Sequence, residues 1–458
     1  MLQKQQSFFE RANDWLRNSI TIRLITIGIL IFILLIPVAM IENLIREREY
    51  RRDDAIREVC SKWGERQTIK GLVLTVPYYV YTKVYDKDDN IKYKLIKTTE
   101  YAHFLPDELN IEGLIQPEVR YRGIYEVIVY NSEIKLTGLF SAPDFEEWDI
   151  TSNNIIWKDA FISLGLSDLR SIQENAELIW NGTGINFNPG VETNDVIGSG
   201  IHAKVPVNCP DTTGSSYEFS LTLNFNGSSE LNFTPLGKET NVTLTSNWPD
   251  PSFDGAFLPD EREITKDGFA AKWNVLHLNR SYPQKFRGSI SGIDESGFGV
   301  NLLMPVDEYQ KSTRAAKYAV LFITLTFLVF FFIQVLNQVR IHPIQYILVG
   351  LALCVFYTLL ISLSEHIRFN VSYLVASISI IALITAYARS LFKRDLLTTL
   401  MALILIILYG FIYTIIQLQD YALLMGSIGL FIVLAIVMYL SRNIDWYSIK
   451  TTKDEGEE

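Results

Sequence analysis

Few residues in this sequence combine the types and spacing that catalysis or metal binding requires. Ser364, Glu365 and His366 include the residue types of a nucleophilic triad, but adjacent positions on a helix do not face each other. Three histidines of the central region stand apart from any Cys or carboxylate pattern with metal-ligand spacing. They are His103, His202 and His277. We therefore expect a non-enzymatic protein with no catalytic residues, no metal and no cofactor, and we interpret Glu365 and His366 as an interfacial cap or a partner surface.

The cysteines are too few to define a framework. Cys60 and Cys209 lie in the same polar region, and Cys354 lies inside an apolar run, where it can serve as a small apolar residue. A disulfide between Cys60 and Cys209 and two separate thiols are both compatible with the spacing.

Residues 245–259 form the most unusual polar stretch, with three aromatic side chains and three prolines in fifteen residues. The aromatic residues are Trp248, Phe253 and Phe257. A proline-rich loop has little backbone entropy left to lose, so it could present these rings to a glycan, a peptide or a membrane surface. The alternative is a long connection that packs over the core of a β domain.

Six long runs without a charged residue determine the class of the protein. About 20 apolar residues are needed to cross the hydrocarbon core of a bilayer. The runs are residues 24–41, 318–339, 344–364, 369–388, 396–419 and 421–441. The sequence therefore predicts a polytopic membrane protein with one N-terminal span and a five-helix bundle over residues 318–441. We expect the first run to be an uncleaved anchor, because it exceeds the length of a signal-peptide core.

Basic residues in the short links predict the orientation, because cytoplasmic loops collect Lys and Arg. An N-terminus inside the cell also places Arg340, the Arg389–Arg394 link and the C-terminal tail inside. The links at residues 365–368 and at Asp420 are then outside. We predict cytoplasmic tails over residues 1–23 and 442–458 and a periplasmic domain over residues 42–317.

The periplasmic domain should begin with a charged helix over residues 42–62 and continue as a mainly β domain. Phe219, Leu221, Leu223 and Phe225 alternate with polar residues, which is typical of a strand with one buried face. The Asn226-Gly227 pair that follows predicts a hairpin to the next strand, and the Gly-rich segments at 181–184 and 198–200 predict turns. A sandwich and a barrel are both compatible with this pattern.

The charge is unevenly distributed along the chain. Residues 42–317 carry 29 Lys and Arg against 41 Asp and Glu, a net charge of −12. An acidic domain is a poor partner for nucleic acid, because phosphate binding requires a basic surface. No Asp, Glu, Lys, Arg or His lies in the interior of an apolar run, which argues against a proton-coupled pump.

Several long segments together resemble the CreD family of bacterial inner-membrane proteins. The segments are LTSNWPDPSFDGAFLPDEREIT, GFAAKW, MPVDEYQKSTRAAKYAVLFITLTFLVFFF, HPIQYILVGLAL, LSEH and RNIDWY. One departure is Gln334, where we expect the family to carry Glu. The resemblance implies a role in cell-envelope integrity, often linked to a two-component stress response, and it implies no established reaction.

The sequence thus predicts an inner-membrane protein whose periplasmic β domain binds or senses an unidentified envelope component. The alternative is a transporter or lipid-handling protein that uses the C-terminal bundle. A third class, a membrane-anchored enzyme, would need convergent carboxylates or histidines in a pocket of the β domain.

Overall fold

The computed structural model describes residues 20–85, 93–208, 216–302, 308–339, 341–418 and 421–442. The predicted tails, apart from their innermost residues, and the predicted link residues Arg340 and Asp420 lie outside these ranges. The chain forms two compact units. One comprises residues 1–52 and 306–458, and the other comprises residues 53–305.

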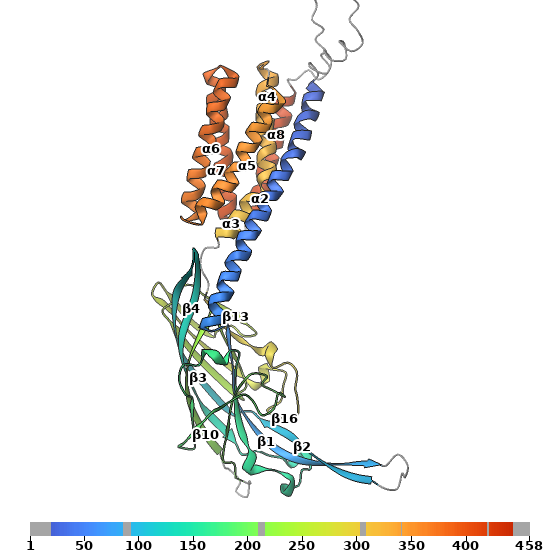
Figure 1. The fold of residues 1–458 in the computed structure, drawn as a ribbon, viewed down its shortest axis with the longest axis vertical. Coiled ribbons are helices and arrows are strands. Elements are labelled where there is room, and N and C mark those ends of the chain that lie inside the picture. Colours follow the sequence, from blue (N-terminus) through green and yellow to red (C-terminus); the bar gives the residue numbers. More distant parts are fainter. Residues whose placement is uncertain are drawn as a thin grey trace, which may run out of the picture. The chain divides into compact units, whose positions relative to one another are not determined.

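Among the described residues, seven helices belong wholly or partly to the first unit. Figure 1 draws them as coiled ribbons. They are α2 (Ile20–Trp63), α3 (Glu308–Lys317), α4 (Ala319–Leu336), α5 (Pro343–Ser364), α6 (Phe369–Phe392), α7 (Asp395–Gln417) and α8 (Ala422–Ser441). All except α3 are long and apolar enough to cross a membrane. The prediction of one N-terminal and five C-terminal membrane helices around a β-rich domain is therefore confirmed.

Local chemistry explains where two of these helices begin and end. At the start of α5, the His342 side chain accepts a hydrogen bond from the Ile344 N–H, and the Gln345 side chain accepts one from the His342 N–H. Pro343 occupies the first turn, where its missing N–H costs nothing. The next helix, α6, ends at its C-cap residue Lys393, whose backbone adopts a left-handed conformation with φ of 52°.

The interior of the bundle is apolar and aromatic. Its buried side chains come from α2, α3, α4, α5, α6 and α7, whereas α8 buries none of its residues. Gly350 of α5 allows a close approach to α2, because a Cβ there would lie 2.2 Å from Leu34 Cδ1. Small residues at such points let membrane helices pack tightly.

The second unit is a sandwich of two β-sheets. The nine-stranded sheet has the order β13-β17-β11-β1-β5-β9-β8, with β2 on β1 and β16 on β2. Its strands are β1 (Gln67–Tyr85), β2 (Tyr93–Phe104), β5 (Phe161–Leu166), β8 (Asn188–Pro189), β9 (Gly200–Lys204), β11 (Glu230–Thr234), β13 (Pro251–Gly255), β16 (Lys285–Arg287) and β17 (Phe298–Leu302).

The eight-stranded sheet has the order β14-β15-β12-β3-β4-β10-β6-β7. Its strands are β3 (Glu108–Arg122), β4 (Tyr125–Ser141), β6 (Glu177–Trp180), β7 (Thr183–Asn186), β10 (Ser216–Ser228), β12 (Glu239–Ser246), β14 (Glu261–Thr265) and β15 (Gly268–Leu276). In the described part of this unit, six short 3₁₀ turns lie in the connections, at residues 146–148, 152–154, 157–159, 169–171, 277–279 and 294–296.

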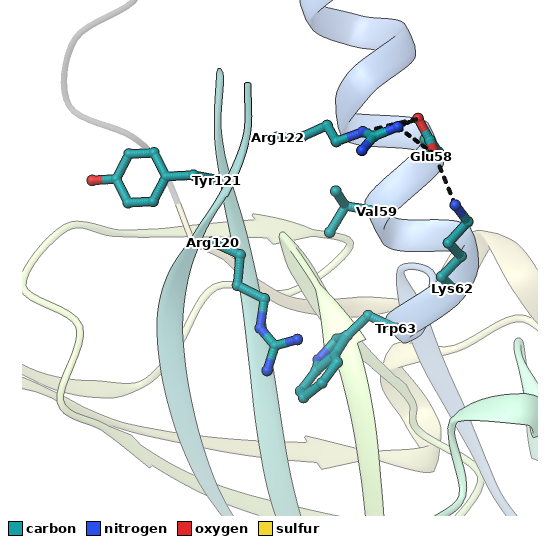
Figure 2. A pocket seen from close by; sticks show the side chains of 7 residues that line it. All are labelled: Glu58, Val59, Lys62, Trp63, Arg120, Tyr121 and Arg122. Atoms are coloured by element: carbon teal, nitrogen blue, oxygen red, sulfur yellow. Dashed lines mark hydrogen bonds and ion pairs between the residues drawn. The ribbon is translucent and has the colours of Figure 1, made fainter. Parts of the chain in front are cut away.

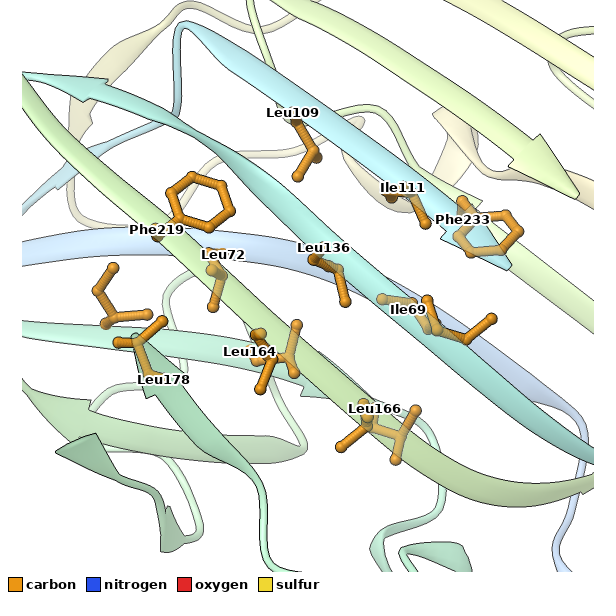
Figure 3. Close-up of a cluster of buried hydrophobic side chains, with 14 of the residues drawn as sticks. Ile69, Leu72, Leu109, Ile111, Leu136, Leu164, Leu166, Leu178, Phe219 and Phe233 are labelled. Atoms are coloured by element: carbon orange, nitrogen blue, oxygen red, sulfur yellow. The ribbon is translucent and has the colours of Figure 1, made fainter. Parts of the chain in front are cut away.

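Both sheets contribute to one hydrophobic core (Figure 3). Leu72 and Leu164 come from the nine-stranded sheet, and Leu136 and Phe219 come from the eight-stranded sheet; all four are almost fully buried. Two sheets that pack face to face over a shared core form a sandwich. The choice between sandwich and barrel, which the sequence left open, is thereby resolved.

The predicted hairpin at Asn226-Gly227 is wrong. Both residues lie inside β10 and pair with Asn131 and Tyr130 of β4. The chain bends at Ser229, with φ of 59°, and then enters the other sheet as β11, which pairs with β1 and β17. Gly227 meets a spatial requirement instead, because a Cβ at this position would lie 2.2 Å from the hydroxyl oxygen of Tyr130.

A second Asn-Gly pair does form a hairpin turn. Asn181 and Gly182 connect β6 to β7, where Trp180 pairs with Thr183. Both turn residues have positive φ, 47° and 80°, as a type I′ turn requires. The turn predicted for residues 181–184 is therefore present.

Candidate functional site

A surface pocket of about 390 Å³ lies between the last turns of α2 and the end of β3 (Figure 2). The guanidinium carbon of Arg120 lies 3.5 Å from the centre of the Trp63 ring, close enough for a cation–π contact. Arg122 Nη2 and Lys62 Nζ lie 3.0 and 2.7 Å from Glu58 Oε1.

The cations of this pocket are paired with carboxylates of the protein. Hydrogen bonds from Lys62 and then from Arg122 lower the pKa of Glu58. Arg120 Nε donates to Glu118 Oε1 at 2.6 Å. Because each of its cations has a carboxylate partner within the protein, the pocket fastens the end of α2 to β3 and offers little unpaired charge to a ligand.

A two-stranded ribbon, formed by the outer parts of β1 and β2, is an exposed feature of the sandwich. β1 and β2 pair continuously from Leu74 and Phe104 to Tyr85 and Tyr93. On its other edge β1 pairs with β5 only as far as Thr75. The outer part of the β1–β2 pair therefore extends away from the rest of the sheet (Figure 1).

Large apolar side chains are exposed on both faces of this ribbon. The register places Tyr81 on the same face as Lys97, and Thr82 opposite Ile96 on the other face. The exposed residues are Tyr81 (49%), Val84 (47%), Leu95 (54%) and Ile96 (45%). The sequence pattern gives no indication that these strands leave the sheet, because pairing partners are set by distant parts of the chain.

The predicted aromatic surface is only partly accessible. The Phe253 ring packs edge to face on Phe269 and Trp273, with both centroid distances 5.7 Å. The Phe257 ring packs in the same way on Phe298, at 5.8 Å. Residues 251–255 form the edge strand β13. Phe253 and Phe257 thus contact the core, as in the packing alternative, and Trp248 is half-buried against it.

Glu365 and His366 lie in the other unit, at the C-terminal end of α5. The Glu365 side chain is only 9% exposed, and Arg48 Nη1 lies 3.5 Å from its Oε2. The Tyr309 hydroxyl donates to Glu365 Oε1 at 3.2 Å. Glu365 therefore joins α2, α3 and α5 in a polar cluster, whereas His366 is exposed. A role of either residue in partner binding stays a prediction.

The candidate disulfide falls partly outside the described residues. Cys209 lies in the undescribed segment 209–215, and Cys60 is half-buried near the end of α2. Cys354 is buried in the bundle, as expected for a small apolar residue.

A buried hydroxyl–imidazole–carboxylate chain is present that the sequence pattern does not reveal. His103 Nδ1 lies 3.0 Å from Thr75 Oγ1, and His103 Nε2 lies 3.2 Å from Asp195 Oδ2. These are the residue types of a nucleophilic triad. Thr75 and His103 are each only 1% exposed, so a substrate would have no access to the hydroxyl. Asp195 is too distant in the sequence for a spacing argument to find it.

A second histidine contacts the segment that carries Asp195. His202 Nε2 lies 3.3 Å from Glu192 Oε1, and its Nδ1 lies 2.9 Å from the Gly190 carbonyl oxygen. The two histidines therefore hold residues 190–195 against the nine-stranded sheet. Within the described ranges, no three His, Cys, Asp or Glu side chains are grouped as metal ligands.

Comparison with solved structures gives only a weak likeness. An M1 zinc metallopeptidase from Deinococcus radiodurans aligns with a TM-score of 0.20 and 11% identity over 37% of this chain and 38% of its own. A substrate-bound mutant of the same enzyme aligns with a TM-score of 0.22 over 43% of this chain and 42% of its own. These values are too low to support an argument about fold or activity.

Comparison of amino-acid sequences shows the family to which the chain belongs. The family model described as inner membrane protein CreD matches residues 19–447. The inner membrane protein CreD of Escherichia coli (strain K12) is 34% identical over 429 residues, which cover 92% of this chain and 93% of that protein. The match includes all six apolar helices and the whole sandwich, and the chain therefore belongs to the CreD family of inner membrane proteins.

Proposed function

We propose that this inner-membrane protein is non-enzymatic and contributes to cell-envelope integrity or to the response to envelope stress. Its sandwich faces the periplasm, both termini are cytoplasmic, and the sandwich binds or senses an envelope component. Membership of the CreD family and the basic residues of the short links support this proposal.

The β1–β2 ribbon is the single observation that carries the binding proposal. An isolated two-stranded ribbon is at best marginally stable in water. This one leaves Tyr81, Leu95 and Ile96 exposed. It also has basic side chains at Lys83, Lys94 and Lys97, although residues 42–317 are acidic overall. Exposed apolar side chains beside lysines fit an anionic partner that covers the ribbon.

The experiment uses the full chain in cells that lack their own copy. The double variant Tyr81→Ser with Leu95→Ser removes exposed apolar surface from one face of the ribbon. We expect this variant to accumulate normally in the membrane but to fail to restore growth in the presence of a detergent that stresses the envelope. A photocrosslinking residue at position 84 should recover the partner from intact cells.

A control double variant replaces one exposed Tyr and one exposed Leu by Ser elsewhere on the sandwich. Tyr121 and Leu278 are 67% and 81% exposed and lie outside the ribbon. Tyr121→Ser with Leu278→Ser should restore growth fully. Equal growth of the ribbon variant and this control would contradict a binding role for the ribbon.

The segment around Trp248 can be tested in the same assay. Trp248→Ala is the informative variant, because Phe253→Ala would also remove contacts with Phe269 and Trp273. An unchanged envelope phenotype with Trp248→Ala would exclude this ring from the binding surface.

A further inference from the structure

A groove lies between α6 and α7, close to the link that joins them. Its volume is about 570 Å³. It is lined by Ala382, Thr385, Ala386 and Arg389 of α6 and by Asp395, Thr398 and Thr399 of α7. The two alanines are one helical turn apart on α6, and their small side chains leave room between the two helices.

The end of the groove nearest the link is basic. Arg389, Lys393 and Arg394 lie within six residues of sequence, and all three side chains are exposed. Arg389 Nη2 lies 3.3 Å from Asp395 Oδ1, and both side chains are mostly solvent-accessible. The single carboxylate leaves a net charge of +2 for residues 389–395. This end of the groove therefore attracts an anion.

The wall of the groove carries hydroxyl groups, one of which has no partner. Thr398 Oγ1 and Thr399 Oγ1 donate to carbonyl oxygens of their own helix, those of Arg394 and Asp395. Thr385 Oγ1 is inaccessible to solvent and has no hydrogen-bond partner among the described residues. Thr399 is exposed, so its hydroxyl oxygen can accept a further hydrogen bond from a ligand in the groove.

The surroundings of the groove are apolar. Leu383, on the same turn of α6, is 55% exposed, and Leu396 and Leu400 on α7 are 81% and 45% exposed. Both helices are long and apolar enough to cross a membrane, so these side chains face lipid. A basic, hydroxyl-bearing groove beside exposed leucines combines the requirements of a charged head group with those of an acyl chain.

We propose that this groove binds one anionic phospholipid. The phosphate pairs with Arg389, Lys393 and Arg394, and a hydroxyl of the head group donates to the exposed hydroxyl oxygen of Thr399. A basic pocket between membrane helices is a recurring type of site for anionic lipids. The proposal concerns the bundle alone and does not depend on ligand binding by the sandwich.

Native mass spectrometry of the full chain in detergent tests the site. Phosphatidylglycerol, phosphatidylcholine and inorganic phosphate are the three probes. We expect a one-to-one adduct with phosphatidylglycerol, weaker retention of phosphatidylcholine, and no displacement of lipid by millimolar phosphate. Because one basic residue near an anionic lipid surface contributes roughly 1 kcal/mol, Arg389→Gln should weaken retention of phosphatidylglycerol about fivefold.

Two variants separate charge from shape. Ala386→Leu fills the groove without changing the charge and should abolish the adduct, and Ala382→Leu serves the same purpose if Ala386→Leu does not fold. Ser379→Leu is the matched control for size, because Ser379 lies one turn before Ala382 on α6 and outside the lining of the groove. Arg442→Gln, at the end of α8, is the matched control for charge. Both controls should retain the lipid.

Three results would overturn the proposal. Equal retention of phosphatidylglycerol and phosphatidylcholine would remove the anionic selectivity. Displacement of the lipid by inorganic phosphate would identify an ion site instead of a lipid site. A loss with Arg442→Gln as large as that with Arg389→Gln would show that the adduct depends on overall charge.

Discussion

At the scale of single residues, His103 is the group whose titration should be measurable. Burial lowers the pKa of His103, and the hydrogen bond to Asp195 only partly opposes this effect. The neutral ring donates from Nε2 to Asp195 and accepts at Nδ1 from Thr75, so both nitrogen atoms are satisfied without a second proton.

This assignment predicts the direction of a pH effect on stability. In the unfolded chain His103 titrates near its ordinary pKa of about 6.5, so below this pH the unfolded state binds the proton more readily. The contribution of His103 to the free energy of unfolding should therefore be fully present above about pH 6.5. It should decrease as the pH is lowered towards the folded-state pKa of His103. A difference of one unit between the two pKa values corresponds to about 1.4 kcal/mol.

Thermal unfolding of the full chain at pH 5 to 8, followed by tryptophan fluorescence, measures this effect. His103→Gln keeps a donor for Asp195 and should flatten the profile between pH 5 and 6.5. His277→Gln, in the same unit, should leave the profile unchanged. A wild-type profile that is already flat in this window would show that His103 does not titrate differently on folding.

Gly227 provides a second prediction at this scale. Tyr130 is fully buried, and its hydroxyl donates to the Glu230 carbonyl oxygen at 2.8 Å. A Cβ at position 227 would collide with this ring, so Gly227→Ala should lower the free energy of unfolding by about 1–3 kcal/mol. Gly198→Ala is the control, because no atom lies within 4 Å of the added Cβ. Equal stability of the two variants would contradict the spatial explanation.

At the scale of elements, a buried hydrogen bond joins α4 to α5. The Tyr346 hydroxyl donates to Gln334 Oε1 at 2.8 Å, and Phe327 packs edge to face on the Tyr346 ring. Such bonds between membrane helices contribute about 0.6–1.7 kcal/mol. Gln334→Leu and Tyr346→Phe should each destabilise the bundle by an amount in this range.

A double-mutant cycle is the control for this bond. If the two residues act together, the double variant should be less destabilised than the sum of the single variants. Unfolding of the purified protein in mixed micelles gives the three free energies. Additive effects would show that the bond between Gln334 and Tyr346 does not stabilise the pairing of α4 and α5.

The same elements show how far the sequence predicts the fold. Alternation in β10 predicted the buried residues Phe219, Leu221 and Phe225 correctly, because a strand with one buried face has a period of two. The partner of β11 was not predictable in the same way. β11 pairs in parallel with β1, from Gln67 with Leu231 to Lys70 with Thr234, and no local pattern specifies a contact over that separation.

The two Asn-Gly pairs illustrate why the local rule failed once. Asn181-Gly182 supplies two positive φ values for a turn, whereas Gly227 supplies space beside Tyr130. Glycine is required in both places, but for different reasons that a single sequence does not distinguish. The candidate surfaces show the same limit, since burial of Phe253 and Phe257 depends on Trp273 and Phe298, which lie further along the chain.

At the scale of the whole molecule, the chain builds two units with separate cores. The sandwich has its own cores within residues 53–305, and the bundle core comes from helices before and after this segment. The ribbon and the lipid groove therefore belong to different units. Variants of one can be compared with variants of the other, so a failed binding experiment on the sandwich leaves the lipid experiment interpretable.

The proposed orientation predicts on which side of the membrane each part of the chain can be labelled. The basic link between α6 and α7 should be cytoplasmic, and the sandwich should be on the opposite side of the membrane. In a chain whose three cysteines are replaced by serine, single cysteines at Lys266 and Lys393 report on the two sides, because both positions are exposed. A maleimide that does not cross the inner membrane should label Lys266→Cys in spheroplasts and should label Lys393→Cys only after the membrane is permeabilised. Labelling of Lys393→Cys in intact spheroplasts would reverse the orientation, and it would then place the sandwich in the cytoplasm, where it could not meet a periplasmic ligand.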